Sequence, residues 1–388
     1  MGAGILLAPQ AAAADKWGPG YSIPDSTGAP DSSHIGAYKV PGADGVAYCA
    51  DPELAGPDAA GGYGAAQAVT SWTSKATGRS ASAENLARAA YVLGKYGQTT
   101  SDEQAAAVDA VVYTYLEAGT TYALPDGKRA LERLGYSNVP PSAKKWATGY
   151  LNEAARFAGP YKINIKPAGG PLQPGVKTPV TLDVTSAAGH KVPGVVLDLD
   201  VTGATADARS VTTNADGVAT AALNPAKDGT VSLKALAKTL PAAQLRSLTP
   251  NDAKAQRLLV AGGVSSAQAE VQLKAESPEG GVTVTKTAAD TRKPLANVEF
   301  ALKDSSGKTL VTGKTDAKGI WKALDLPVGT YTVQEVRAVE GYQLAADQKA
   351  TVTDGKNTAV AVEDVRIPEK PKPKPRPVTI TVLPQTGA

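Results

Sequence analysis

The sequence predicts a multidomain protein in which a helical N-terminal domain is followed by two β-sandwich domains. Three observations support this fold class. The chain has 388 residues, of which 42% are hydrophobic, and this suffices for several packed cores. Up to about residue 158, apolar residues recur every three or four positions, as in helices. After Gly159 they recur at every second position, as in strands.

The composition argues against several classes of protein. The chain carries 40 basic and 37 acidic residues, so it lacks the basic surplus of a dedicated nucleic-acid binder. One cysteine and two histidines exclude an intrachain disulfide and a histidine-rich metal site. No apolar run reaches the roughly 18 residues that a membrane span requires. We therefore expect no metal, no cofactor and no nucleic-acid partner.

The first 44 residues show no sustained hydrophobic period. Residues 1–14 contain a short apolar run and then four alanines before Asp15, which resembles the remnant of a secretory signal peptide with its cleavage site. A disordered alanine-rich arm is the alternative. Residues 15–44 are rich in Gly, Pro, Ser and Asp, and this composition predicts an irregular arm.

Residues 45–158 are expected to form the helical domain. Ser82 can cap a first helix, and Ser101 and Gln104 have the spacing of a capping box before a second. Ser142 begins a third. The apolar faces of the three helices hold Leu86, Ala89, Leu93, Val108, Val112, Trp146, Tyr150 and Phe157.

The strand pattern falls into two blocks. Residues 160–275 predict an Ig-like β-sandwich, with a turn at 214–217 and a polar insertion at 241–258 for which the pattern suggests no role. A Gly- and Pro-containing linker at 276–281 precedes the second sandwich, which we place at 281–366.

The second sandwich resembles a SpaA-type prealbumin-like domain, the Cna B-type fold of surface proteins and pilins. In that family a lysine on a strand joins an asparagine or aspartate on the last strand, assisted by a glutamate. The resemblance implies these roles for Lys286, Asp364 and Glu335. The matching segments are residues 282–286, 293–302, 329–335 and 341–342.

The strand period supports these three positions independently. Lys286 has the parity of Val282 and Val284, and Glu335 and Asp364 have the parity of the apolar residues before them, so all three side chains point inward. Burial favours a neutral amine and a protonated carboxyl, which permits an isopeptide bond between Lys286 and Asp364 with loss of water. A buried ion pair without reaction is the alternative, and the family more often has Asn at the position of Asp364.

The only cysteine lies in a segment, residues 48–52, that resembles the cysteine strand of the thioester, or TQXA, domain of Gram-positive adhesins. There the cysteine forms a thioester with a glutamine that opens a helix. In the corresponding segment, residues 107–113, Asp109 stands where the glutamine belongs. An aspartate must lose hydroxide rather than ammonia, so we expect Cys49 and Asp109 to form a degenerate thioester site.

Other outcomes remain open for this domain. Gln104 and Gln67 are alternative partners by proximity, and a buried cysteine that acts as a small hydrophobe is the common case. Without a thioester the domain can still bind its target noncovalently through aromatic residues. The candidates for such a surface are Tyr63, Trp72, Tyr91 and Tyr113.

The C-terminal residues resemble an anchoring signal. Alternating prolines at 367–382 predict a polyproline II wall stem, of which ten residues span about 30 Å. Residues 383–388 resemble the LPXTG sorting signal of Gram-positive surface proteins, which a sortase cleaves between Thr386 and Gly387. Only Ala388 follows, where the family continues into an apolar segment, so we expect a trimmed or truncated chain. The motif consists of Leu383, Pro384, Gln385, Thr386 and Gly387.

Together these patterns predict a secreted, cell-wall-anchored surface protein that acts in adhesion or surface display and is not an enzyme. Its expected partners are a sortase, an amine of peptidoglycan or of a pilus subunit, and an unknown host or environmental ligand. A pilin-type structural subunit is the first alternative, although no Tyr-Pro-Lys pilin motif is present. A secreted wall or polysaccharide enzyme is the second.

Overall fold

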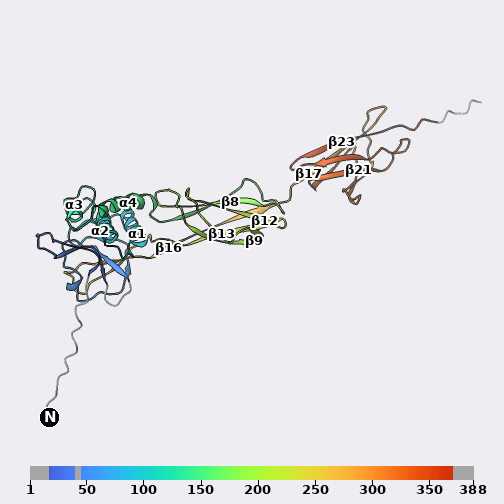
Figure 1. Cartoon of the computed structure of the whole chain (residues 1–388). Helices are drawn as coiled ribbons and strands as arrows, with labels where there is room; N and C mark the ends of the chain where they lie inside the picture. Colours follow the sequence, from blue (N-terminus) through green and yellow to red (C-terminus); the bar gives the residue numbers. More distant parts are fainter. Residues whose placement is uncertain (1–16, 40–44, 370–388) are drawn as a thin grey trace, which may run out of the picture. The chain divides into compact units, whose positions relative to one another are not determined.

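The computed structural model describes residues 17–39 and 45–369, which form two compact units divided between Ala275 and Glu276 (Figure 1). The predicted signal-peptide remnant, the sorting motif and the stem beyond Glu369 lie outside the described residues. The described part of the chain is mostly β, because many strands in several sheets accompany four α-helices.

The helices pack together in the first unit, and Figure 1 shows them beside one another. The hydroxyl oxygens of Ser82 and Ser101 accept hydrogen bonds from the backbone N–H groups of Asn85 and Gln104, so both predicted caps are present. The third predicted helix starts at Pro141. The helices are α1 (Ala83–Tyr96), α2 (Asp102–Leu116), α3 (Lys128–Gly135) and α4 (Pro141–Phe157).

The N-terminal domain also contains a six-stranded sheet, so the predicted helices are present but the domain is not purely helical. Its order is β1-β2-β3-β15-β14-β4, and a short pair, β5 and β6, and a 3-10 turn, η1, lie nearby. The bounds are β1 (Trp17–Ile23), β2 (Ser33–Lys39), β3 (Val46–Cys49), η1 (Pro57–Ala59), β4 (Gln67–Ala68), β5 (Trp72–Thr73), β6 (Ser80–Ala81), β14 (Arg246–Leu248) and β15 (Leu258–Val260).

The irregular arm predicted at 15–44 is wrong, since β1 and β2 pair there. Gly20 lies opposite Gly36 in this pair, with φ of 142° and 148°. A Cβ on either glycine would come within 3 Å of the ring nitrogen Nε2 of His34. The two glycines therefore make room for the buried ring of His34 between the paired strands. The amino-acid composition of this segment nevertheless resembles that of a loop.

The polar insertion at 241–258 has a clear structural role. It leaves the sandwich and carries β14 and part of β15 into the N-terminal sheet. Arg257 forms a two-point ion pair with the buried carboxylate of Asp51, in which Nη2 lies 2.6 Å from Oδ1. The Arg257 guanidinium also lies 3.5 Å from the centre of the Trp72 ring. The insertion therefore completes the sheet of the N-terminal domain by joining β3 to β4.

The remaining strands of the first unit form a sandwich of two four-stranded sheets, β10-β12-β8-β7 and β11-β9-β13-β16. Alternate residues of β8, β12 and β13 are buried between the sheets. The strands are β7 (Lys162–Pro167), β8 (Thr178–Thr185), β9 (Val196–Thr202), β10 (Ala204–Ala206), β11 (Ser210–Thr212), β12 (Val218–Pro225), β13 (Gly229–Pro241) and β16 (Val264–Ala275).

The second unit is a sandwich with sheets β20-β17-β23 and β19-β18-β21-β22. Its first strand begins at Glu279, inside the stretch predicted as a linker. The strands are β17 (Glu279–Ala288), β18 (Glu299–Lys303), β19 (Thr309–Lys314), β20 (Ile320–Pro327), β21 (Gly329–Arg337), β22 (Gln348–Val352) and β23 (Asn357–Asp364).

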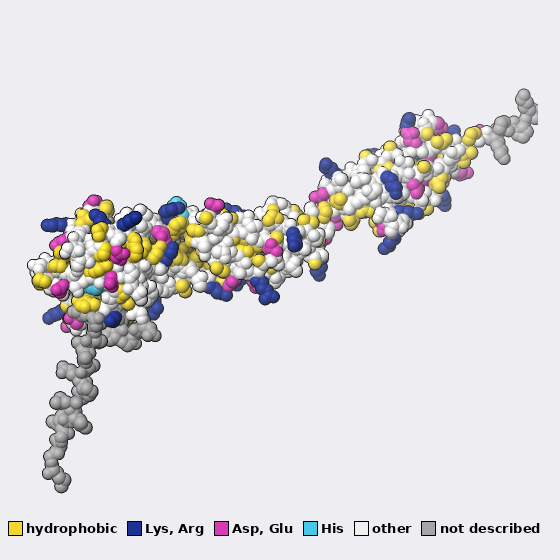
Figure 2. Space-filling model, in the orientation of Figure 1, with side chains coloured by type: hydrophobic (Ala, Val, Ile, Leu, Met, Phe, Trp, Pro, Cys, Tyr) yellow, Lys and Arg dark blue, Asp and Glu magenta, His cyan; other side chains and the backbone are white. Residues whose placement is uncertain are grey.

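Acidic and basic side chains are interspersed on the face shown in Figure 2, without a basic stripe on either unit. In the described ranges, no helix has the length and apolar character to cross a membrane.

Candidate functional site

The first and last strands of the second unit place a lysine beside an aspartate. β17 and β23 are parallel, and Lys286 is in register with Val362. Asp364 lies two residues farther along β23, so its side chain projects from the same face of the sheet as that of Val362. The Lys286 ammonium and the Oδ1 atom of Asp364 form a buried ion pair.

The facing sheet supplies the third group. Glu335 lies on β21 opposite Phe300 of β18. Its Oε2 atom accepts hydrogen bonds from Lys286 Nζ and from the backbone N–H of Ala345, both at 3.0 Å. The Phe300 ring lies under the ammonium, with its centre 5.8 Å from Nζ. The structure thus brings together the three residues singled out in the sequence.

All three side chains are excluded from solvent. The side-chain exposure of Lys286, Glu335 and Asp364 is 0%. Burial raises the pKa of the Glu335 carboxyl, which favours its neutral form. One oxygen of each carboxyl, Glu335 Oε1 and Asp364 Oδ2, has no hydrogen-bond partner among the described residues. A buried amine, an electrophilic carboxyl and a protonated acid are the components that amide formation needs.

Cys49 occupies a different environment. It lies at the end of β3, pairs with Leu258 of β15 and is 2% exposed. Tyr38 and Tyr113 belong to the same buried cluster. Burial raises the pKa of the Cys49 thiol, and the nearby charge of Asp109 acts in the same direction. The thiol is therefore the stable form, and the thiol is a poor nucleophile.

Asp109 is committed to another partner. It lies on α2, and its Oδ2 atom is 2.8 Å from the guanidinium of Arg133 on α3. Burial raises the pKa of the Asp109 carboxyl to about 6, while the Arg133 cation opposes this shift. The alternative glutamines are also placed elsewhere: Gln104 donates to the carbonyl of Tyr96 at 2.9 Å, and Gln67 is exposed on β4.

The aromatic residues proposed as a binding surface do not form one. Trp72, Tyr91 and Tyr113 are buried, and Tyr63 is only half-exposed. Tyr91 lies instead in a cavity of about 790 Å³ between α1, α4 and the end of β13.

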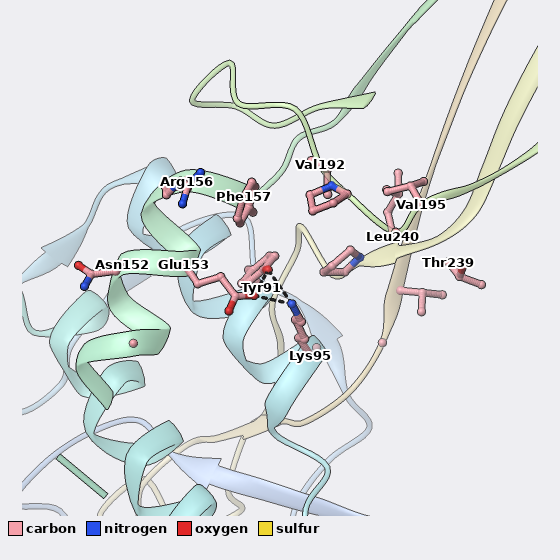
Figure 3. Close-up of a pocket in the computed structure, with 17 residues that line it drawn as sticks. Tyr91, Lys95, Asn152, Glu153, Arg156, Phe157, Val192, Val195, Thr239 and Leu240 are labelled. Atoms are coloured by element: carbon pink, nitrogen blue, oxygen red, sulfur yellow. Dashed lines mark hydrogen bonds and ion pairs between the residues drawn. The ribbon is translucent and has the colours of Figure 1, made fainter. Parts of the chain in front are cut away.

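Figure 3 shows Tyr91, Lys95 and Glu153 directed toward one another in this cavity, opposite Val192 and Leu240. The Glu153 carboxylate accepts hydrogen bonds from the hydroxyls of Tyr91 and Tyr96, at 2.5 and 2.6 Å, and pairs with Lys95. Because the Glu153 carboxylate is satisfied by these partners, this polar centre joins α1 to α4.

Within the described part of the chain, no group of three or more His, Cys, Asp or Glu side chains could hold a metal ion.

A comparison with models of protein families identifies the fold of the second unit. The SpaA prealbumin-like fold domain matches residues 280–366. No curated protein sequence matches the chain. The C-terminal unit therefore contains a SpaA-type prealbumin-like domain.

Among solved structures, the Bacillus anthracis TIE protein matches with 14% identity and a TM-score of 0.45, over 90% of this chain and 65% of that chain. BcpA, the major pilin subunit of Bacillus cereus, matches with 17% identity and a TM-score of 0.28, over 53% of this chain and 71% of that chain. GBS52, the minor pilin of Streptococcus agalactiae, matches with 18% identity and a TM-score of 0.25, over 55% of this chain and 99% of that chain. The chain thus spans 65% of the first of these structures.

Proposed function

We propose that this chain is an exported structural protein of a Gram-positive surface, of the pilin-subunit type, whose C-terminal domain is closed by an isopeptide bond between Lys286 and Asp364. The observation that carries the proposal is the buried cluster of Lys286, Glu335 and Asp364 inside a SpaA-type domain. This cluster favours the structural role, which the sequence left as an alternative, over adhesion as the main task.

The reaction is a condensation. The neutral amine of Lys286 attacks the carboxyl carbon of Asp364, while protonated Glu335 donates a hydrogen bond to the carbonyl oxygen. The new C–N bond replaces a C–O bond, and one water leaves. Glu335 shuttles the proton from nitrogen to the departing hydroxyl and is regenerated. Burial raises the pKa of the Glu335 carboxyl and so favours the protonated form that this path requires.

The position of the bond suits a protein under tension. Force enters the domain near Glu279 at the start of β17 and leaves after Asp364 at the end of β23. A covalent bond from Lys286 to Asp364 carries that force directly across 78 positions of sequence. The strands between Lys286 and Asp364 then carry no pulling force, and this part of the chain cannot be extended.

Anchoring belongs to the same proposal. The motif from Leu383 to Gly387 supplies the sortase substrate, and an amine of peptidoglycan or of another subunit accepts the acyl group. The proline-rich stem would separate the folded domains from that attachment point. Covalent ladders in wall extracts, lost when Thr386 is replaced, would distinguish a polymerised subunit from a singly anchored one.

Intact mass of the folded chain tests the bond. The reacted chain should be lighter than its sequence by one water. Asp364→Asn should lose ammonia instead of water, so its product should have the same mass as the reacted parent. Glu335→Gln should retain the full sequence mass. Glu363→Gln, on the outward face of β23 next to Asp364, should still react. A full sequence mass for the folded parent chain would refute the bond.

A further inference from the structure

The loop between β21 and β22, residues 338–347, contacts the buried polar cluster of the second unit. Its backbone N–H at Ala345 donates a hydrogen bond to Oε2 of Glu335 at 3.0 Å. The side chains of Val339 and Ala345 pack against the hydrophobic core of the domain. The loop is therefore anchored at two points on the core, and one of them is the glutamate of the cluster.

Glu335 is held through only one of its two carboxyl oxygens. Oε2 accepts hydrogen bonds from the Ala345 N–H and from Lys286 Nζ, whereas Oε1 has no partner among the residues that the structure describes. Lys286 is itself a reactant, because its nitrogen becomes the nitrogen of the amide. The hydrogen bond from Ala345 is therefore the one of the two that keeps Glu335 in place throughout the reaction.

The same hydrogen bond decides which oxygen of Glu335 carries the proton. Because Oε2 already accepts two N–H groups, the acidic hydrogen of the neutral carboxyl belongs on Oε1. Within the described ranges, Oδ2 of Asp364 is the other oxygen of the cluster that has no hydrogen-bond partner. Ala345 thus leaves Oε1 available as a donor to the carboxyl that the amine attacks.

Two backbone hydrogen bonds tie the loop to the residues that follow β23. The Gln343 N–H donates to the carbonyl of Val365 at 2.8 Å, and the Ile367 N–H donates to the carbonyl of Gly341 at 2.9 Å. We call this pair of hydrogen bonds the clasp. Val365 directly follows the aspartate of the cluster. The clasp therefore fixes both the end of β23 and the loop that carries Ala345.

A tight turn presents the loop to the clasp. The Tyr342 N–H donates to the carbonyl of Val339 at 3.0 Å, and Gly341 between them has a φ of 84°, which favours glycine. The Tyr342 ring lies against the guanidinium of Arg366, whose carbon is 5.8 Å from the ring centre. This glycine and tyrosine thus build the turn and the clasp that hold Ala345.

We propose that the Ala345 N–H positions Glu335 for the isopeptide reaction, and that the clasp keeps Ala345 in place. Ala345 is a positioning residue, because it acts on the reaction through Glu335. The inference rests on the proposed bond between Lys286 and Asp364. Misplacement of a catalytic group by about 1 Å can slow a reaction about a hundredfold. Loss of the Ala345 N–H should therefore slow bond formation while the domain stays folded.

The rate of water loss after cell-free synthesis of the full-length chain tests this proposal. Samples are quenched in acid, and intact mass gives the reacted fraction at each time. Ala345→Pro removes the N–H and should slow the reaction at least about tenfold. Ala345→Ser retains the N–H and should restore the rate. Ile367→Pro removes one hydrogen bond of the clasp and should slow the reaction about threefold or more.

Ser305→Pro is the matched control for the introduction of a proline. Ser305 is exposed at the second position of the turn between β18 and β19, where the Gly307 N–H donates to the carbonyl of Asp304. Proline is favoured at that position, so this variant should react at the rate of the parent chain.

A second measurement separates positioning from folding. The same substitutions are introduced into the unreactive Glu335→Gln chain, and calorimetry should show that the C-terminal domain is folded at the temperature of the assay. If Ala345→Pro unfolds the domain, Ile367→Pro decides the question. Parent-like rates in the folded variants, or slowing no larger than the unfolded fraction explains, would overturn the positioning role.

The parent chain distinguishes this result from a failure of the proposed function. A parent that loses one water while the folded variants react equally fast retains the isopeptide bond and removes only the role of Ala345. A folded parent that keeps its full sequence mass removes the bond, and the positioning role with it.

Discussion

Replacing Glu335 with glutamine should leave the C-terminal domain folded but not cross-linked. A glutamine keeps an oxygen that can accept from Lys286 and Ala345, yet it has no acidic proton to transfer. Constraint of the unfolded chain across 78 positions, treated like a disulfide loop, is worth about 4.5 kcal/mol. The unfolding entropy of a domain of this size is about 0.18 kcal/mol/K, so we expect a loss of about 25 °C in the melting temperature.

Differential scanning calorimetry of the full chain measures this loss. One transition, that of the C-terminal domain, should move down, and the transitions of the first unit should stay in place. Glu363→Gln is the matched control, because this carboxylate lies next to Asp364 but is 41% exposed and pairs with Arg292. Equal melting temperatures for the parent and the Glu335→Gln variant would refute the reasoning, since an uncrosslinked cluster cannot constrain the unfolded chain.

Three further predictions concern the first unit. Glu153→Ala should lower the free energy of unfolding by about 2 kcal/mol, because it removes the hydrogen-bond acceptor that joins α1 to α4. Glu84→Ala is the control: it breaks only an exposed ion pair with Arg88 within α1 and should cost less than about 0.5 kcal/mol. Asp51→Ala should cost about 3 to 5 kcal/mol in urea unfolding, because it leaves Arg257 unpaired. Burial lowers the pKa of His34 to about 4. The unfolded chain therefore binds a proton at His34 near pH 6.5, whereas the folded chain does so only near pH 4. His34 should thus lower the free energy of unfolding by about 3 kcal/mol between pH 7 and pH 4, and His34→Gln should remove this pH-dependent loss. Unchanged values in these measurements would contradict the assigned contacts.

The period of the strands predicted that the three residues implied by the resemblance to a SpaA-type domain point into the core. Side chains alternate between the two faces of a strand, so a charged residue in phase with buried valines must enter the core. Lys286, Glu335 and Asp364 each meet this condition, and each is buried. The helix caps at Ser82 and Ser101 were predictable for a similar reason, since a cap is a local contact within one turn of the helix.

Local patterns also misled in identifiable places. The paired glycines of β1 and β2 resemble loop residues, and only the His34 ring beside them explains why glycine is needed. Helix α3 is short and carries Arg129 and Arg133 inward, so it lacks an apolar period. A buried arginine is identified by its carboxylate partner, and Asp109 is distant in sequence.

The sequence by itself determined which residues of this protein are inward-facing in regular strands and helices, because those periods are set by backbone geometry alone. It also supplied the resemblance of the C-terminal domain and the three polar residues that cluster in its core. Only the tertiary structure decided that the insertion returns to complete the N-terminal sheet, and that Asp109 pairs with Arg133. Those contacts join residues far apart in the chain, and their energy depends on burial and partner charge, which a local pattern does not contain.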